Sequence, residues 1–109
     1  MITILGAGAI GQLLAHKLTE ASIDCQLIVK ADAQYRSEWC LTHQEHQIYH
    51  EIPAVVAQDC DELRQVWVCV KSHQLEAALD SISHAITDST NVVLFQNGMG
   101  HEKIALRYI

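Results

Sequence analysis

The sequence feature that most constrains the fold is a glycine pattern between an apolar run and a helical repeat. Gly6, Gly8 and Gly11 form G-x-G-x-x-G directly after the apolar run 2–5. Apolar residues then recur at helical spacing up to about residue 20, and a second apolar run covers 25–29. This order predicts strand, turn, helix and strand, a unit whose crossover is almost always right-handed.

The spacing of the three glycines has a mechanical meaning. In a dinucleotide-binding turn the first permits a tight bend, the second lets the backbone approach a pyrophosphate, and the third lets the helix pack on the strand. The phosphates then lie at a helix N-terminus, which favours anions. We therefore expect the cofactor-binding turn to consist of Gly6, Ala7, Gly8, Ala9, Ile10 and Gly11. The alternative is a glycine-rich turn that only connects strand and helix.

The rest of the chain continues the alternation of strands and helices. Apolar runs predict strands at 66–70 and 91–95, and helical spacing predicts helices over about 72–86 and 101–108. The middle is less regular and predicts strand or hairpin pieces over 39–57. Strands that are apolar throughout indicate a parallel sheet covered on both faces. The expected fold class is α/β: one Rossmann-type, doubly wound, mostly parallel domain over 1–109.

Charge and composition exclude several classes of function. The 109 residues carry a formal charge of −6, and nucleic-acid binding needs a basic surface. The acidity is concentrated in residues 37–63, which contain acids and no Lys or Arg. No apolar run is long enough to span a membrane and no signal peptide is evident, so a cytoplasmic location is expected. The four cysteines form no C-x-x-C pair and are expected as reduced thiols.

The end of the second predicted strand indicates which dinucleotide is bound. An acid there would accept the ribose 2′-hydroxyl of NAD, whereas a cation would accommodate the 2′-phosphate of NADP. The residue at that position is Lys30, which favours NADP(H). A solvated Lys30 is the alternative; Asp32 follows closely, and Arg36 is another candidate donor.

Two further clusters lie at the ends of later strands. Lys71 and Gln74 follow the run 66–70, and Asn97-Gly98-Met99-Gly100 follows the run 91–95. Loops at the carboxyl ends of parallel strands line the ligand crevice, so both clusters are expected there. For Asn97-Gly98 an ordinary turn is the alternative, since this dipeptide tolerates positive φ.

Three stretches in order resemble the ketopantoate reductase (2-dehydropantoate 2-reductase) family: ITILGAGAIGQLLAHKL, VWVCVKSHQLEAAL and NVVLFQNGMGHEKI. The resemblance implies reduction of a small keto acid, 2-dehydropantoate, to (R)-pantoate with NADPH, on the route to pantothenate and coenzyme A. It implies that Lys30 contacts the 2′-phosphate, and that Lys71 and Gln74 lie beside the cofactor. Asn97 matches an asparagine near both the nicotinamide ribose and the substrate.

The resemblance also indicates what this chain lacks. Hydride transfer to a carbonyl requires a proton donor or fixed cation at the oxygen. In the family this donor is a lysine of a second, mostly helical domain, which is absent from residues 1–109. We therefore expect no catalytic residue in this chain and no turnover by it alone; a homodimer remains open as its assembly.

Two rival functions use the same fold. One is another NAD(P)-dependent hydroxyacid dehydrogenase, which an acid in place of Lys30 would favour. The other is a regulatory nucleotide-sensing module of the potassium-transport type, which usually has an acid after the second strand. Lys30 and the turn from Asn97 to Gly100 count against the sensor.

Metal binding and histidine catalysis are the weaker interpretations. Cys40, His43, His46 and His50 have spacings that could converge on zinc, but their segment is acidic and irregular. We expect a solvated hairpin and no metal site. His73 could be proposed as a general acid; we expect an early helix residue at the crevice rim.

Overall fold

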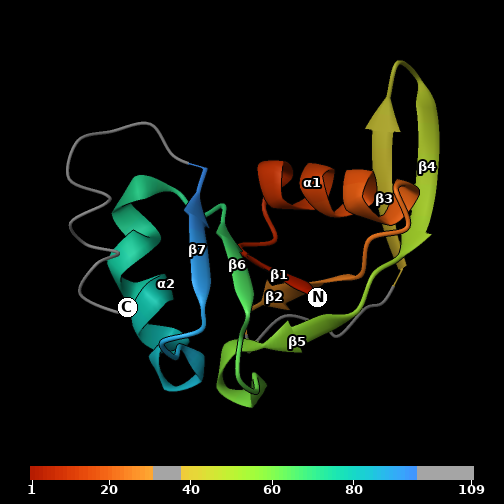
Figure 1. Cartoon of the computed structure of the whole chain (residues 1–109). Helices are drawn as coiled ribbons and strands as arrows, with labels where there is room; N and C mark the ends of the chain where they lie inside the picture. Colours follow the sequence, from red (N-terminus) through yellow and green to blue (C-terminus); the bar gives the residue numbers. More distant parts are fainter. Residues whose placement is uncertain (31–37, 96–109) are drawn as a thin grey trace.

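The computed structural model describes residues 1–30 and 38–95, and it forms a parallel sheet flanked by layers on both faces (Figure 1). The sheet has five strands in the order β5-β2-β1-β6-β7, and every neighbouring pair is parallel. The strands are β1 (Ile2–Leu5), β2 (Cys25–Val29), β5 (Ala54–Val56), β6 (Gln65–Val68) and β7 (Asn91–Leu94). The predicted doubly wound α/β fold is confirmed.

Different elements cover the two faces of the sheet. The helix α1 (Ala9–Glu20) lies on one face beside an antiparallel hairpin of β3 (Glu38–His43) and β4 (His46–Glu51). The helix α2 (Leu75–Ser81) lies on the other face. Alternate residues of each strand supply the two cores, so Ile4 packs toward α1 whereas Leu5 packs toward α2. At the β7 edge of the sheet, Val93 of β7 and Phe95 just after the strand remain 38% and 36% exposed.

The hairpin occupies the position that a crossover helix would take between β2 and β5 (Figure 1). Trp39 and Ile52 anchor it in the core on the α1 face, with exposed fractions of 6% and 1%. The Trp39 indole Nε1 donates a hydrogen bond to the Ile52 carbonyl at 3.3 Å. The irregular middle of the sequence is thus a hairpin followed by a short strand, as predicted.

The strand predicted over 66–70 ends earlier, at Val68. Cys69 still donates its backbone N–H to the Leu5 carbonyl at 2.9 Å, but Val70 turns away and packs beside Gly6. The apolar run continues past the strand because the turn itself is partly buried. The prediction placed Lys71 at the strand end; it lies three residues beyond it.

The helix predicted after Lys71 is shorter than its apolar spacing suggested. It begins with a 3₁₀ turn at Ser72–Gln74, continues as α2 and ends at Ser81. A second 3₁₀ turn follows at Ser83–Ala85, where the Ser83 hydroxyl donates to the Asp80 carbonyl at 2.9 Å. Such serine-to-backbone bonds compete with helical ones, while Ile82 and Ala85 stay buried and so preserve the apolar pattern.

The buried side of α1 differs from the stripe of large apolar residues in the sequence. Ile10 and Leu13 are 54% and 42% exposed, while the buried positions are Gly11, Ala15, His16 and Leu18. Small residues allow the helix to lie close to the sheet. The large residues at its N-terminal end instead lie at its surface.

Several predictions fall outside the described residues: Asp32, Arg36, Asn97, the glycines that follow it, and the helix expected over 101–108. No helix within the described ranges is long and apolar enough to cross a membrane.

Candidate functional site

A cleft of about 1200 Å³ opens along the carboxyl ends of the parallel strands. The strand order reverses between β1 and β6, because β1 connects to β2 on one side and β6 connects to β7 on the other. Ligands of open α/β sheets bind in the crevice at this reversal. The cleft extends from the end of β5 across β2 and β1 to the turn after β6, and α2 forms one wall.

The glycine turn lies in the middle of the cleft, and two of its glycines are required by the chain itself. Gly6 has φ +112°, a conformation that L side chains rarely adopt, and a Cβ there would lie 2.9 Å from Val70 Cγ1. A Cβ on Gly11 would overlap the Gly6 carbonyl oxygen. The first and third glycines therefore allow the turn to bend and α1 to begin close to β1.

Gly8 is different, because nothing in the described chain explains it. A Cβ at this position would meet no atom within 4 Å, and its φ of −79° is available to any residue. Gly8 is the N-cap of α1, carries no side-chain cap, and no acid lies in the first turn. The open space beside Gly8 and the uncapped helix end fit an anionic group that approaches the backbone.

The charged residues of the described cleft are two lysines. Lys30 follows β2 and Lys71 follows the turn after β6, so one lies on each side of the glycine turn. No acidic side chain is among the described lining residues, although the whole chain carries −6. The cleft is therefore suited to a ligand with negative charge at more than one point.

The structure brings most of the predicted site residues together. Gly6, Ala7, Gly8, Ala9 and Ile10 line the cleft, and so do Lys30, Lys71 and Gln74. Gly11 lies behind this surface, in contact with Gly6. The predicted cofactor and substrate contact Asn97 lies outside the described residues.

Other cleft residues were not predicted from the sequence. Gln12 donates from Nε2 to the Ala7 carbonyl at 2.7 Å and so ties the glycine turn to the helix it precedes. Trp39 enters the wall because the hairpin folds back on α1, and Gln58 enters from the 3₁₀ turn that follows β5. The position of Gln12, just after the glycine pattern, was a usable signal. Trp39 had none, since its place depends on the hairpin.

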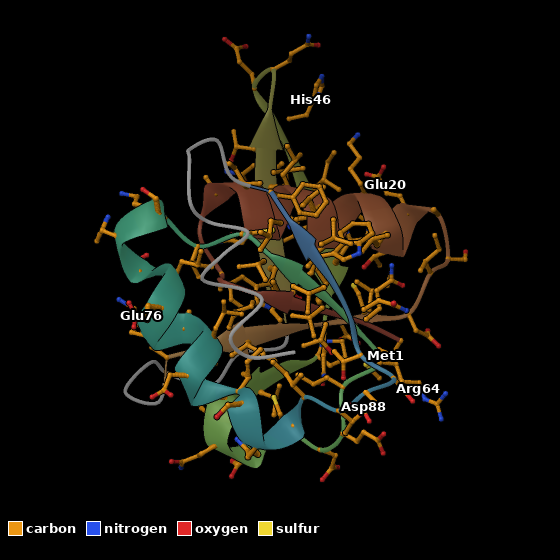
Figure 2. The ribbon with its side chains drawn as sticks, turned by 60° about the vertical axis from the view of Figure 1, so that its left-hand side comes forward. Met1, Glu20, His46, Arg64, Glu76 and Asp88 are labelled. Atoms are coloured by element: carbon orange, nitrogen blue, oxygen red, sulfur yellow. The ribbon has the colours of Figure 1, made fainter. Side chains whose placement is uncertain are left out.

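The cysteines and histidines form no metal centre in the described part of the chain. No group of three or more metal-ligating side chains is found there, and His46 is exposed near the hairpin tip (Figure 2). Cys69 lines the cleft, but burial raises the pKa of its thiol to about 11, so it stays protonated near neutral pH. His50 departs from the expected solvated hairpin: it is half-buried and bonded to His16.

Comparisons with known proteins agree with this geometry. A 2-dehydropantoate 2-reductase of Mesorhizobium japonicum is 35% identical over 103 residues, which cover 90% of this chain and 32% of that protein. A putative 2-dehydropantoate 2-reductase from Enterococcus faecalis superposes with a TM-score of 0.83 at 25% identity, over 98% of this chain and 37% of the other. A D-mandelate dehydrogenase, in a ternary structure with NADH, superposes with a TM-score of 0.89 at 26% identity. The match covers 99% of this chain and 37% of the other.

This chain thus spans about one third of the length of these relatives. The family profile described as ketopantoate reductase PanE/ApbA matches residues 2–109. On this match, and on the sheet and glycine turn described above, the chain belongs to the ketopantoate reductase PanE/ApbA family.

Proposed function

We propose that this chain is the NADPH-binding domain of a 2-dehydropantoate 2-reductase-like oxidoreductase. The observation that carries the proposal is the cleft itself. An open glycine turn at a helix N-terminus lies between two lysines, with no acid among the described lining residues. This arrangement fits a dinucleotide with a pyrophosphate in its middle and a further phosphate at its adenosine end.

Each part of the cleft then has a role. The backbone from Gly6 to Ile10 and the N-terminus of α1 receive the pyrophosphate, and Lys30 pairs with the 2′-phosphate. Gln58, in the 3₁₀ turn Ala57–Asp59 that follows the neighbouring strand β5, lies on the same side of the cleft as Lys30. Lys71 and Gln74 lie on the opposite side, toward the nicotinamide half, and we assign Asn97 to the nicotinamide ribose and the substrate.

The bound cofactor would supply a hydride to the keto carbon, while a proton reaches the carbonyl oxygen to give the hydroxyl group. This chain's described residues bind and orient the dinucleotide. We assign the proton donor, and most of the keto acid pocket, to a further helical domain of the kind seen in the family. We accordingly expect the 109-residue chain to bind NADPH without reducing 2-dehydropantoate; reduction by the purified chain would contradict this assignment.

The test of the cofactor assignment is the binding of NADPH and NADH to the parent chain and to Lys30→Glu. A charge-assisted hydrogen bond contributes about 1.5–3 kcal/mol, and about 1.4 kcal/mol is tenfold in affinity. We expect Lys30→Glu to weaken NADPH binding by about tenfold or more and to leave NADH binding nearly unchanged. Isothermal titration calorimetry would measure both constants.

The control is Lys17→Glu, which changes the net charge by the same amount. Lys17 lies on α1 with its side chain 66% exposed, in an ion pair with Glu20 at 3.8 Å, and it does not line the cleft. The Lys17→Glu variant should keep a dissociation constant for NADPH close to the parent value. Equal losses in the two variants would show that net charge, not a 2′-phosphate contact, controls affinity.

The strongest rival is an NAD-dependent hydroxyacid dehydrogenase, which the fold similarity to D-mandelate dehydrogenase with NADH favours. The same titration decides between them, because tighter NADH than NADPH binding by the parent chain supports the rival. A nucleotide-sensing module is the less favoured alternative, given the family match. Sedimentation measurements would separately test whether the chain forms a homodimer.

A further inference from the structure

Two histidines far apart in the sequence meet between α1 and the hairpin, away from the glycine turn. His16 of α1 and His50 of β4 have their Nδ1 atoms 2.7 Å apart and their ring centroids 4.9 Å apart. His16 is fully buried, and its Nε2 has no hydrogen-bond partner among the described residues. This His16–His50 pair is a polar contact joining the hairpin to α1.

The hydrogen bond restricts where the protons lie. Only one of the two Nδ1 atoms can carry a hydrogen, because the other must accept it. If His16 donates from Nδ1, its buried Nε2 carries no hydrogen. If His50 donates instead, His16 Nδ1 is the acceptor, and neutral His16 must carry its one ring hydrogen on Nε2. Either arrangement leaves the buried Nε2 without a partner. An orphaned buried N–H is rarer in proteins than an orphaned acceptor, so the neutral pair is expected to have the His16 hydrogen on Nδ1.

Adding a proton disturbs this pair whichever ring receives it. If His16 is protonated, its Nε2 gains a hydrogen directly. If His50 is protonated, it must donate from Nδ1, and neutral His16 then again carries its hydrogen on Nε2. Either way the added proton puts an unpartnered N–H in the core. A second proton would place two donors face to face and remove the bond.

The groups around His16 favour its neutral form at neutral pH. Burial lowers the pKa of His16, His50 lowers it further, and Glu20 on the same helix raises it by a smaller effect. Lys17 is paired with Glu20. The hairpin residue opposite His50 is the neutral Trp39. On β2, the Cys25 thiol donates to the Ala15 carbonyl, and burial raises the pKa of this thiol.

The pair is connected to the cleft through one residue. Trp39 lies opposite His50 in the hairpin register, on the neighbouring strand, and it lines the cleft with Lys30. A shift of β4 relative to α1 would therefore move a wall of the cleft on its Lys30 side. The pair holds that wall in place without itself lining the cleft.

We propose that the His16–His50 pair is a proton-sensitive latch that positions Trp39, so that protonation loosens the hairpin and weakens dinucleotide binding. The proposal rests on the proposed function for its effect on NADPH. Its structural part is independent of that function. His16 and His50 are positioning residues, since they act through Trp39.

The direction of the pH effect follows from the lowered pKa of His16. The unfolded chain takes up a proton near pH 6.5, whereas the folded chain resists it to lower pH. The contribution of His16 to stability is thus fully present above pH 6.5. It is lost as the pH falls from 6.5 through the lower folded pKa.

The structural test is nuclear magnetic resonance of the imidazole rings and of the Trp39 indole N–H between pH 8 and 5. We expect His16 to carry its hydrogen on Nδ1 at pH 8, and the Trp39 resonance to shift as the pair is protonated. His46→Asn removes an exposed histidine of the same hairpin and should leave that shift unchanged. A hydrogen on His16 Nε2 at pH 8, or a Trp39 resonance that does not shift when the pair is protonated, would overturn the latch.

The functional test compares NADPH affinity at pH 8 and 5.5 in the parent, His16→Asn and His46→Asn. The 2′-phosphate titrates near pH 6 in every case, so only the difference between chains matters. Between pH 8 and 5.5, we expect the affinity of the parent and of His46→Asn to fall by about threefold more than that of His16→Asn. This effect is smaller than the full cost of an unsatisfied buried donor. Equal losses in all three would overturn the proposal.

A second variant covers the case in which His16→Asn does not fold. His16→Phe fills the buried site with no titratable nitrogen, and between pH 8 and 5.5 it should lose about threefold less NADPH affinity than the parent, as expected for His16→Asn. Absence of NADPH binding at every pH would overturn the proposed function instead. The Trp39 resonance would then be the measurement that decides whether the His16–His50 pair positions Trp39.

Discussion

At the scale of single residues, the three glycines of the turn answer to different physical demands. Gly6 and Gly11 are fixed by the chain, through a positive φ and a close approach of backbone atoms. Gly8 has an ordinary conformation and open space around it. We therefore expect any requirement for glycine at Gly8 to come from the ligand, whereas that at Gly6 and Gly11 comes from folding.

This difference predicts opposite outcomes for two alanine substitutions. Gly8→Ala should leave the melting temperature within about a degree of the parent and weaken NADPH binding by about tenfold, because its methyl group enters the space of the pyrophosphate. Gly11→Ala should lower the free energy of unfolding by about 1–3 kcal/mol, the usual cost of overpacking. Thermal melts with and without NADPH would separate the two.

A Gly8→Ala variant that melts early would contradict the open space at this position. One that binds NADPH like the parent would show that the ligand does not approach Gly8. Gly11→Ala serves as the matched control, since it changes the same turn by the same single methyl group.

At the scale of elements, the hairpin turn is built from unfavourable residues. Gln44 and Glu45 both have positive φ, 47° and 67°, as in a type I′ turn. Residues other than Gly, Asn and Asp adopt this conformation at a cost of about 1–2 kcal/mol each. Replacing the pair by Asn-Gly should therefore raise the free energy of unfolding by about 1 kcal/mol.

Urea denaturation of the double variant Gln44→Asn, Glu45→Gly would measure this gain. NADPH affinity should stay unchanged, because the turn does not line the cleft. The control is Gln47→Asn, an exposed β4 residue without positive φ, which should not be stabilised. A loss of stability in the double variant would show that the side chains of Gln44 and Glu45 make contacts that outweigh the backbone strain.

The elements that could be predicted from the sequence are those whose pattern is local. The strands β1 and β2 match their apolar runs residue for residue, and the start of α1 follows from the glycine turn. The ends of β6 and α2 were missed because Val70 and Ile82 stay packed in turns beyond the regular elements. Burial continues there while the backbone pattern does not.

The candidate site divides in the same way. Lys30, Lys71 and Gln74 were predicted because each follows a strand of a parallel sheet, and such positions share one edge. Trp39 and the His16–His50 pair could not be predicted, since 34 residues separate the two histidines and only the folded hairpin brings them together. Sequence patterns therefore located the part of the cleft made by the sheet and missed the part made by the hairpin.

At the scale of the whole molecule, the charges of the cleft and of the remaining surface oppose each other. The chain carries −6 overall, while the described cleft is lined by two lysines and no acid. The Debye length is about 30 Å at 10 mM salt and about 8 Å at 150 mM. A distant anion is therefore repelled by the net negative charge of the molecule, and only an anion close to the cleft is attracted by the lysines.

This arrangement has a consequence for the rates of binding. Raising the salt from 10 to 150 mM screens the long-range repulsion and should speed association of NADPH, and it should also speed dissociation by weakening the lysine contacts. Stopped-flow fluorescence would measure both rates, and association that slows with added salt would show that the lysines dominate even at a distance. We therefore expect the two lysines to govern how long a nucleotide stays bound, and the acidic surface to govern how often one arrives.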